Sequence, residues 1–262
     1  KYVENERPEF LKNLSTARSP MQMFASVLKE NYRKKDAEDG RTTFHIAIMP
    51  CTAKKMEARR EEFRDAYGVP YVDLVLTTQE VVQMMKESGI RFQMLEKESP
   101  DLPYGMGSGA AEIFGTSGGV AEAVIRCCTP DKSKNALRTI EHSGIRGTDA
   151  VRFAEVTING RKVRAAIVHG LGSAAKLLDQ IQSGEVQADL VEVMSCRTGC
   201  VGGAGQPYGL KATKEKRGDG LHQSDNAAMF KRAERNPIVV RMMAEYGEER
   251  CHELLHVSYR GE

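Results

Sequence analysis

The stretch from residue 192 to residue 207 constrains this chain more than any other, because an apolar run leads directly into two cysteines and a glycine cluster. Residues 189–194 (Asp-Leu-Val-Glu-Val-Met) predict a buried strand, so Cys196 and Cys200 would lie where that strand gives way to a loop. The glycines let the backbone approach a bulky group and leave amide N–H groups free to point at it. Thiolates combined with such donors are typical of an iron–sulfur cluster. We therefore expect a metal cluster at this loop.

The composition is compatible with an enzyme but does not indicate which reaction it would catalyse. The chain has 262 residues, of which 40% are hydrophobic, and can bury a sizeable core as one large domain or two lobes. Its net charge of +2 favours no nucleic-acid partner. No apolar run approaches the roughly 20 residues that span a bilayer, so we expect no membrane span. Because the chain begins with Lys1 instead of Met, we expect it to be part of a longer reading frame.

The six cysteines are too sparse for a disulfide-dependent fold, since such folds are small and cysteine-dense. Cys127 and Cys128 are adjacent within a predicted helix over residues 120–128, where thiols usually pack as small apolar groups. Cys251, in the polar approach to the last predicted helix, is expected to pack in the same way. These three cysteines are therefore interpreted as structural.

Cys51 differs from those three because it ends an apolar run, follows Pro50, and precedes two cations. Lys54 and Lys55 would favour the thiolate form of Cys51 and could donate a hydrogen bond to an anionic ligand. The alternative is a buried cysteine at a strand end beside two surface lysines. The presence of the second cysteine motif downstream favours a ligand.

Periodicity, caps and turn signals predict an α/β protein with a parallel or mixed sheet. Strands are expected at residues 44–49, 71–76, 150–158, 162–169 and 189–194. Helices are expected from Pro20, at 53–66, from the Thr77–Glu80 capping box to about residue 89, and at 120–128, 173–183, 237 onward and 249–258. Asn159-Gly160 predicts a type I′ turn between the third and fourth strands. The charge runs at 58–64 and 211–217 are most simply solvated faces.

A second glycine-rich segment, residues 104–119, ends directly before the helix at 120–128. Glycines before a helix N-terminus can cradle an anion or a cluster. The segment has no Gly-Lys-Ser/Thr ending, so it is not a Walker loop. By itself it is more simply an ordinary loop.

Two motifs together carry a family resemblance. They are Met49-Pro-Cys-x-x-Lys-x-x-Glu57 and Glu192-x-Met-x-Cys-x-x-x-Cys-x-Gly-Gly-x-Gly-Gln-Pro207, and they closely resemble motifs of the catalytic domain of the [FeFe] hydrogenases. The resemblance extends along the whole chain through residues 13–20, 114–120, 168–171 and 252–256, and Tyr259. It implies two lobes of parallel or mixed β-sheet flanked by helices, with the cluster site in the cleft between them. It also implies that residues 1–210 are the H-cluster domain found at the C-terminal end of the family's large subunit, incomplete at its N-terminus, and that 211–262 resemble the helical small-subunit segment.

The resemblance implies an H-cluster, in which a [4Fe-4S] cubane is linked to a two-iron subcluster carrying CO, cyanide and a bridging dithiolate. Cys51, Cys196 and Cys200 would ligate the cubane, and Cys200 would bridge to the two-iron subcluster. Lys54 would hydrogen-bond a cyanide, and Ser15 would belong to the proton relay. The side chains that would line the pocket are Met49, Phe114 and Met194.

The implied reaction is the reversible interconversion of two protons and two electrons with H₂. Ferredoxin or a similar carrier would exchange the electrons, maturation proteins would be needed, and upstream ferredoxin-like domains or subunits are possible. A cytoplasmic location is expected, with the periplasm as the alternative. A low-activity sensory hydrogenase, a hydrogenase-like iron–sulfur assembly factor without the two-iron subcluster, and a zinc- or thiol-stabilised structural domain are the competing hypotheses.

The chain departs from the family in two places. The first family motif, Thr-Ser-Cys-Cys-Pro-x-Trp, is not in the sequence, although it would supply the fourth cubane ligand and the cysteine that delivers protons. Ala204 stands where the family usually has the middle glycine of Gly-Gly-Gly-Gln-Pro. We therefore expect that these 262 residues alone do not hold an intact H-cluster.

Overall fold

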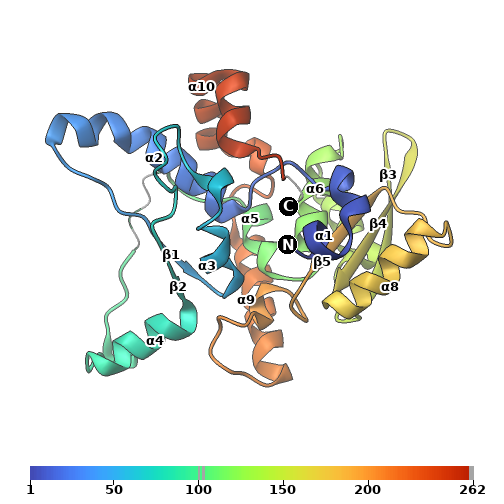
Figure 1. Cartoon of the computed structure of the whole chain (residues 1–262). Coiled ribbons are helices and arrows are strands. Elements are labelled where there is room, and N and C mark those ends of the chain that lie inside the picture. The colour runs from blue at the N-terminus through green and yellow to red at the C-terminus, as the bar shows by residue number, and fades with distance from the viewer. Residues whose placement is uncertain (100, 102–103, 260–262) are drawn as a thin grey trace. The chain divides into compact units, whose positions relative to one another are not determined.

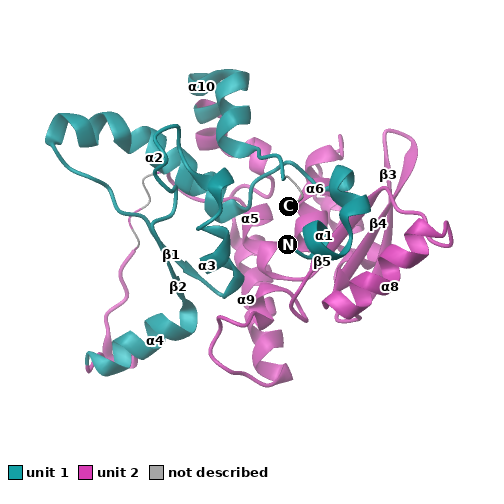
Figure 2. Cartoon of the chain, in the orientation of Figure 1, with its two compact units in different colours: residues 1–88, 242–262 teal, residues 89–241 magenta. Residues whose placement is uncertain are grey.

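Two separate β-sheets, each accompanied by helices, organise the chain in the computed structural model, which describes residues 1–99, 101 and 104–259. Figure 2 shows the two units to which they belong: unit 1 is residues 1–88 and 242–262, and unit 2 is residues 89–241. The two-stranded sheet is parallel and the three-stranded sheet is mixed. The predicted α/β class is therefore confirmed. The predicted boundary at residue 210 concerns family segments and stays a prediction.

From α2 to α4 the elements of unit 1 alternate helices and strands in the predicted order, and the short helix α1 before them was not predicted (Figure 1). The elements of unit 1 are α1 (Tyr2–Glu6), α2 (Pro20–Asp39), β1 (Ile46–Met49), α3 (Ala53–Glu57), β2 (Leu74–Thr77) and α4 (Thr78–Glu87). Unit 2 contains α5 (Gly109–Glu112), α6 (Gly119–Cys128), α7 (Lys134–Ile140), β3 (Val151–Ile158), β4 (Arg161–His169), α8 (Leu171–Gln182), β5 (Leu190–Met194) and α9 (Lys211–Ala227). α10 (Pro237–Leu255) begins in unit 2 and ends in unit 1.

Local capping signals fix the start of two helices in unit 1. Ser19 caps α2, and its hydroxyl accepts a hydrogen bond from the Gln22 amide. Thr77 and Glu80 form the predicted reciprocal capping box of α4, because each side chain accepts from the other residue's amide. Both predicted helix starts are confirmed.

The predicted helix over residues 53–66 is wrong beyond Glu57. α3 stops there, the chain is extended at Arg60, and only a short 3-10 turn follows. Arg60 donates to Glu4, which is itself buried, and Phe63 is 1% exposed in the core of unit 1. The charge run at 58–64 is thus partly an interior contact and not only a solvated face.

The three-stranded sheet of unit 2 is built around β4, which pairs antiparallel with β3 and parallel with β5. Asn159 and Gly160 join β3 to β4 with φ of 51° and 76°, which confirms the predicted type I′ turn. Successive β4 residues face opposite sides of the sheet. One side packs on α6 and α7 and the other on α8 (Figure 1). Because β4 is covered on both faces, residues 165–168 are fully buried.

The C-terminal helices were predicted separately, and the structure joins them as α10 with a break at Gly247, where φ is 73° and ψ is 169°. Asn236 caps the first part through its Oδ1, which accepts from the Ile238 amide. Cys251 is buried, as predicted. None of the helices that the structure describes combines the length and apolar character needed to cross a bilayer.

Candidate metal centre

Two thiols emerge where β5 ends. The Cys196 carbonyl accepts from the Gly199 amide at 3.2 Å, which closes a turn, and Cys200 begins a 3-10 turn whose first carbonyl accepts from Gly203 at 2.9 Å. Gly199 lies between them with φ of 85°. Both thiols are partly exposed, and neither forms a disulfide. The predicted strand-to-loop placement of Cys196 and Cys200 is therefore observed.

The glycine segment of unit 2 lies against this cysteine loop. The Ser117 amide donates to the Thr198 carbonyl at 3.3 Å, and a Cβ on Gly199 would come within 2.7 Å of the Ser117 nitrogen. Gly119 is tighter still, since a Cβ there would meet the carbonyl oxygen of Ile113, in the same segment, at 1.8 Å. Gly199 therefore allows the two loop backbones to pack closely. The weaker prediction for the glycine segment, a cradle for an anion or a cluster, stays a prediction.

Glu192 fixes the start of α6 beside β5. Its carboxylate accepts from the amides of Gly118 at 2.6 Å and Ala121 at 2.7 Å, and the residue is 7% exposed. Burial raises the pKa of Glu192, while these two amides and the nearby Arg152 oppose the rise. This role of Glu192 was not predicted from the sequence. The sequence does show a carboxylate inside an apolar strand. Such a group predicts hydrogen-bond donors around it, because a buried carboxylate without them is costly.

A second buried contact joins the glycine segment to the sheet. Arg152 donates to the Ser117 carbonyl at 2.9 Å and to the Ile145 carbonyl at 3.2 Å. His169, opposite Met194 in the β4–β5 register, has its Nδ1 3.3 Å from the Ser117 hydroxyl. Burial and the charges of Arg152 and Arg197 lower the pKa of His169. We therefore expect a neutral imidazole beside this segment at pH 7.

α9 holds the far end of the cysteine loop. Arg217 donates to the carbonyls of Val201 at 3.2 Å and Pro207 at 3.0 Å. The prediction of a purely solvated charge run at 211–217 is therefore wrong for this residue. Arg217 satisfies carbonyls of an irregular loop that has no sheet partner of its own.

α6 and α9 are joined by a buried ion cluster. The carboxylate oxygens of Glu122, Glu141 and Asp225 lie within 4.8 Å of one another. Arg126 and Arg146 already pair with all three carboxylates. This cluster is therefore interpreted as an ion-pair network and not as a metal site.

Three of the four predicted site residues of unit 1, namely Met49, Cys51 and Lys54, lie at or just after the end of β1. Cys51 follows the strand and is partly exposed, and Met49 packs against the core of unit 1. Lys54 pairs with Glu57 one turn further along α3. The exposed Ser15 accepts from the Ala17 amide at 3.2 Å.

Of the predicted residues, Phe114, Met194, Cys196 and Cys200 all belong to unit 2. Phe114 lies in a 3-10 turn inside the glycine segment and is partly exposed. Met194 is the last residue of β5. The structure thus brings the segments of these four residues to one region of unit 2, and their ligand and pocket roles stay predictions. Cys127 and Cys128 are exposed, so the expectation that they pack in the interior is wrong.

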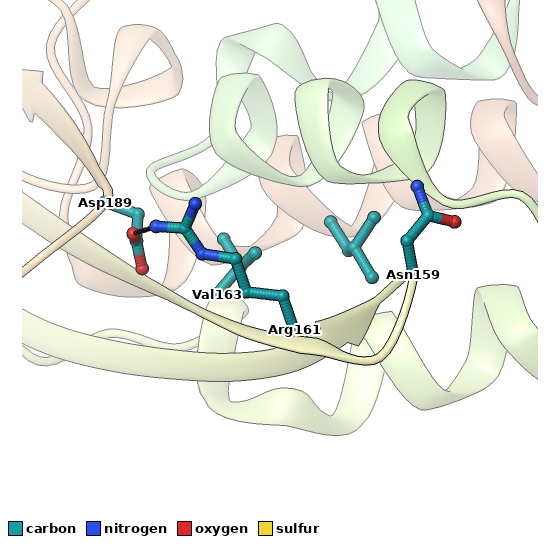
Figure 3. Close-up of a pocket in the computed structure, with 5 residues that line it drawn as sticks. Asn159, Arg161, Val163 and Asp189 are labelled. Atoms are coloured by element: carbon teal, nitrogen blue, oxygen red, sulfur yellow. Dashed lines mark hydrogen bonds and ion pairs between the residues drawn. The ribbon is translucent and has the colours of Figure 1, made fainter.

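A separate hollow lies at the opposite end of the same sheet. It is lined by residues of the β3–β4 turn and by Asp189, and Figure 3 shows the ion pair between Arg161 and Asp189 at 2.8 Å. Asp189 precedes β5 and the cysteines follow it, so a strand of roughly 16 Å separates the two places. The hollow is therefore not the cysteine site.

An α/β unit whose strand end presents two thiols beside a glycine segment is a candidate metal-cluster domain. The family described as the C-terminal domain of the iron only hydrogenase large subunit matches residues 1–204. The chain belongs to this family, as the [FeFe]-hydrogenase resemblance predicted.

Individual relatives include both hydrogenases and assembly factors. Iron hydrogenase 1 of Clostridium pasteurianum is 36% identical over 268 residues, covering 98% of this chain and 46% of that protein. Cytosolic iron-sulfur assembly component 3 of Mus musculus is 30% identical over 276 residues, covering 98% of this chain and 56% of that protein. A solved structure of a variant of the [FeFe]-hydrogenase HydA1 from Chlamydomonas reinhardtii has a TM-score of 0.79 at 30% identity, covering 99% of this chain and 73% of that one. The chain spans about half the length of the curated relatives it matches.

Proposed function

We propose that this chain forms the H-cluster domain of an [FeFe] hydrogenase, which interconverts H₂ with two protons and two electrons. The observation that carries the proposal is the cysteine loop at the end of β5, packed against the part of the glycine segment that follows Phe114, residues 115–117. Three thiols outside disulfides, Cys51, Cys196 and Cys200, offer the soft ligands that an iron–sulfur cubane requires. The chemistry of this donor set therefore fits the proposed group.

In this proposal Cys51, Cys196 and Cys200 hold the cubane, together with a fourth ligand from the family's first motif. When bound, the H-cluster supplies the redox and proton chemistry of the reaction. Lys54 would donate to an anionic ligand of the cluster, and its present partner Glu57 would keep it oriented.

The apolar side chains Met49, Phe114 and Met194 would exclude water from the reacting site. Ser15, exposed at the surface of unit 1, would accept and pass on a proton through its hydroxyl. Electrons would be exchanged with ferredoxin or a similar carrier, and a cytoplasmic location is proposed.

The second candidate is an iron–sulfur assembly factor that shares the fold but lacks the two-iron subcluster. The similarity to the cytosolic assembly component of Mus musculus favours it. Lys54, Phe114, Met194 and the Gly-Gln-Pro ending at 205–207 favour the hydrogenase, as does the higher identity to Iron hydrogenase 1.

Infrared spectroscopy separates these functions. The family's first cysteine motif is joined ahead of Lys1, and the protein is produced with hydrogenase maturation proteins. Bands of metal-bound CO and cyanide together with H₂ production are the expected result. Brown colour without such bands would assign the assembly-factor function, and a colourless protein would refute any iron–sulfur function.

A matched pair of cysteine variants tests the ligand assignment. Cys200→Ala is expected to abolish the CO and cyanide bands, because it removes the proposed bridge. Cys128→Ala serves as the control, since Cys128 is exposed on α6 and has no proposed role. Equal band intensities in both variants would contradict the assignment of Cys200.

A further inference from the structure

His252 lies in the last turn of α10, and His256 follows the last helical residue, Leu255, with its amide still donating to the His252 carbonyl at 2.9 Å. Residues four apart lie on one face of a helix. The two imidazole rings are stacked, with centroids 4.5 Å apart and planes 4° from parallel. Two imidazole rings therefore lie side by side at this end of α10.

His256 is held in place by a neighbouring segment of unit 1. Its Nδ1 lies 2.8 Å from the Thr16 hydroxyl, and its carbonyl accepts from Arg18 Nε at 2.9 Å. The following residue, Val257, donates its amide to the Thr16 carbonyl at 2.7 Å. Because Nδ1 is hydrogen-bonded to Thr16, Nε2 is the ring nitrogen that can bind a metal ion. A hydrogen bond to the second ring nitrogen is the arrangement that orients metal-binding histidines.

His252 supplies the other ring and is exposed. Both rings lie at the C-terminal end of α10, where the helix dipole and the last carbonyls favour a cation. Arg18 offsets part of this field, because it donates to the carbonyls of Glu253 and His256. The local charge therefore permits a cation without strongly attracting one.

We propose that His252 and His256 bind a divalent transition-metal ion through their Nε2 atoms, with water completing its coordination. Imidazole is a preferred ligand of Zn²⁺, Ni²⁺ and Cu²⁺. Two nitrogens bonded to one ion at about 2.0–2.1 Å lie roughly 3 Å apart. Because the ring-nitrogen lone pairs of rings stacked within 4° of parallel lie in parallel planes, the exposed His252 ring would turn out of the stack to bring its Nε2 to an ion held by His256. The site uses none of the proposed cluster ligands Cys51, Cys196 and Cys200 and does not depend on the proposed hydrogenase function.

The same residues read as His-Glu-x-x-His, the spacing used by zinc hydrolases, but the site lacks their remaining parts. Glu253 pairs with Arg250 at 2.5 Å, so its carboxylate is not poised as a base. Among the described residues, His252 and His256 belong to no cluster of three or more closely spaced metal-ligating side chains. The site is therefore a binding site and not a hydrolytic centre.

Calorimetric titration of the intact chain with Ni²⁺ tests the proposal. Ni²⁺ is chosen because imidazole suits it, whereas Zn²⁺ would also bind the cysteine thiolates. His252→Asn is the decisive variant, since its exposed ring has few packing contacts to lose. We expect His252→Asn to weaken binding at least tenfold. Thr16→Val is expected to weaken it by about tenfold, because it removes the hydrogen bond that orients His256.

His142→Asn is the matched control, since His142 is also exposed, on unit 2, with its Nδ1 bonded to the Arg138 carbonyl. Its Ni²⁺ affinity is expected to equal that of the unchanged chain. Equal affinity of His252→Asn and the unchanged chain would overturn the proposal. So would complete loss of binding when the cysteines alone are alkylated, with the far-UV circular dichroism spectrum unchanged.

Discussion

Arg126 is the side chain whose removal tests most directly how unit 2 is held together. It lies on α6, is fully buried, and donates to both carboxylate oxygens of Asp225 on α9 at 2.9 and 2.7 Å. The same guanidinium donates to Glu122 at 2.5 Å. Glu122 and Asp225 are 0% and 1% exposed. Replacing Arg126 by Met keeps most of the volume but leaves two buried carboxylates short of a partner.

The expected loss of unfolding free energy depends on the ion pairs that Arg146 still makes in the variant. Breaking a buried ion pair costs about 3–5 kcal/mol, because one charge is left buried without its partner. Arg146 still contacts Glu122 at 2.7 Å and Asp225 at 3.4 Å, so we expect the lower end, about 3 kcal/mol. With a urea m-value of roughly 2 kcal/mol/M, Arg126→Met should lower the midpoint for unit 2 by about 1.5 M.

Urea unfolding followed by far-UV circular dichroism measures this loss. Arg146→Met is the control, since Arg146 is more exposed and its loss leaves Arg126 in place, so a smaller effect is expected. Replacing Arg126 and Asp225 together by apolar residues should recover part of the loss. A loss below about 1 kcal/mol in Arg126→Met, with an unchanged m-value, would refute the idea that this pair anchors α9.

The stability that the Arg126–Asp225 pair contributes should fall at low pH. Burial acts to raise the pKa of Asp225, but the hydrogen bonds and charge of Arg126 hold that pKa below its usual value. A lowered folded-state pKa contributes stability that is present above the unfolded value of about 3.9 and is lost as the pH falls through the folded value. The difference between the unchanged protein and Arg126→Met should therefore shrink below pH 4.

Three further changes test local contacts by thermal unfolding. Glu192→Gln should cost about 2 kcal/mol, because two amides lose a charged acceptor, and no change in Tm would contradict that role. Gly199→Ala should cost about 1–3 kcal/mol, since φ is 85° and the new Cβ would lie 2.7 Å from the Ser117 nitrogen. An unchanged Tm would mean that the cysteine loop can move away from the glycine segment without loss of stability. Thr77→Ala should cost about 1 kcal/mol by removing half of the capping box with Glu80, whereas an unchanged Tm would show that the cap is dispensable.

The parts of the fold that the sequence predicted are set by neighbours in the chain. The capping box joins Thr77 to a residue three positions away, and the β3–β4 turn needs only Asn159 and Gly160. The end of α3 was missed because it depends on Arg60 reaching Glu4, 56 residues earlier. No periodicity within residues 53–66 records that contact.

The same distinction explains the site. Cys196 and Cys200 form a contiguous motif, so their place after β5 could be predicted. Glu192 bonds an amide 74 residues away, and a sequence without an alignment does not record such a pair. Cys127 and Cys128 were misplaced because the buried stripe of α6 includes the charged residues Glu122 and Arg126, which hydrophobic periodicity does not count as interior.

The loop that carries Cys196 and Cys200 is held by contacts that need no metal. The Ser117 amide and the side chains of Glu192 and Arg217 fix the loop or its flanks through hydrogen bonds to backbone groups within unit 2. A structural zinc site behaves differently, because metal binding there supplies the folding free energy. Replacing Cys196 and Cys200 by Ser should therefore leave the metal-free urea midpoint nearly unchanged, and a chelator should not unfold the chain. Unfolding by a chelator, or a large loss of stability in the double variant, would instead assign these thiols to a metal-stabilised structural domain.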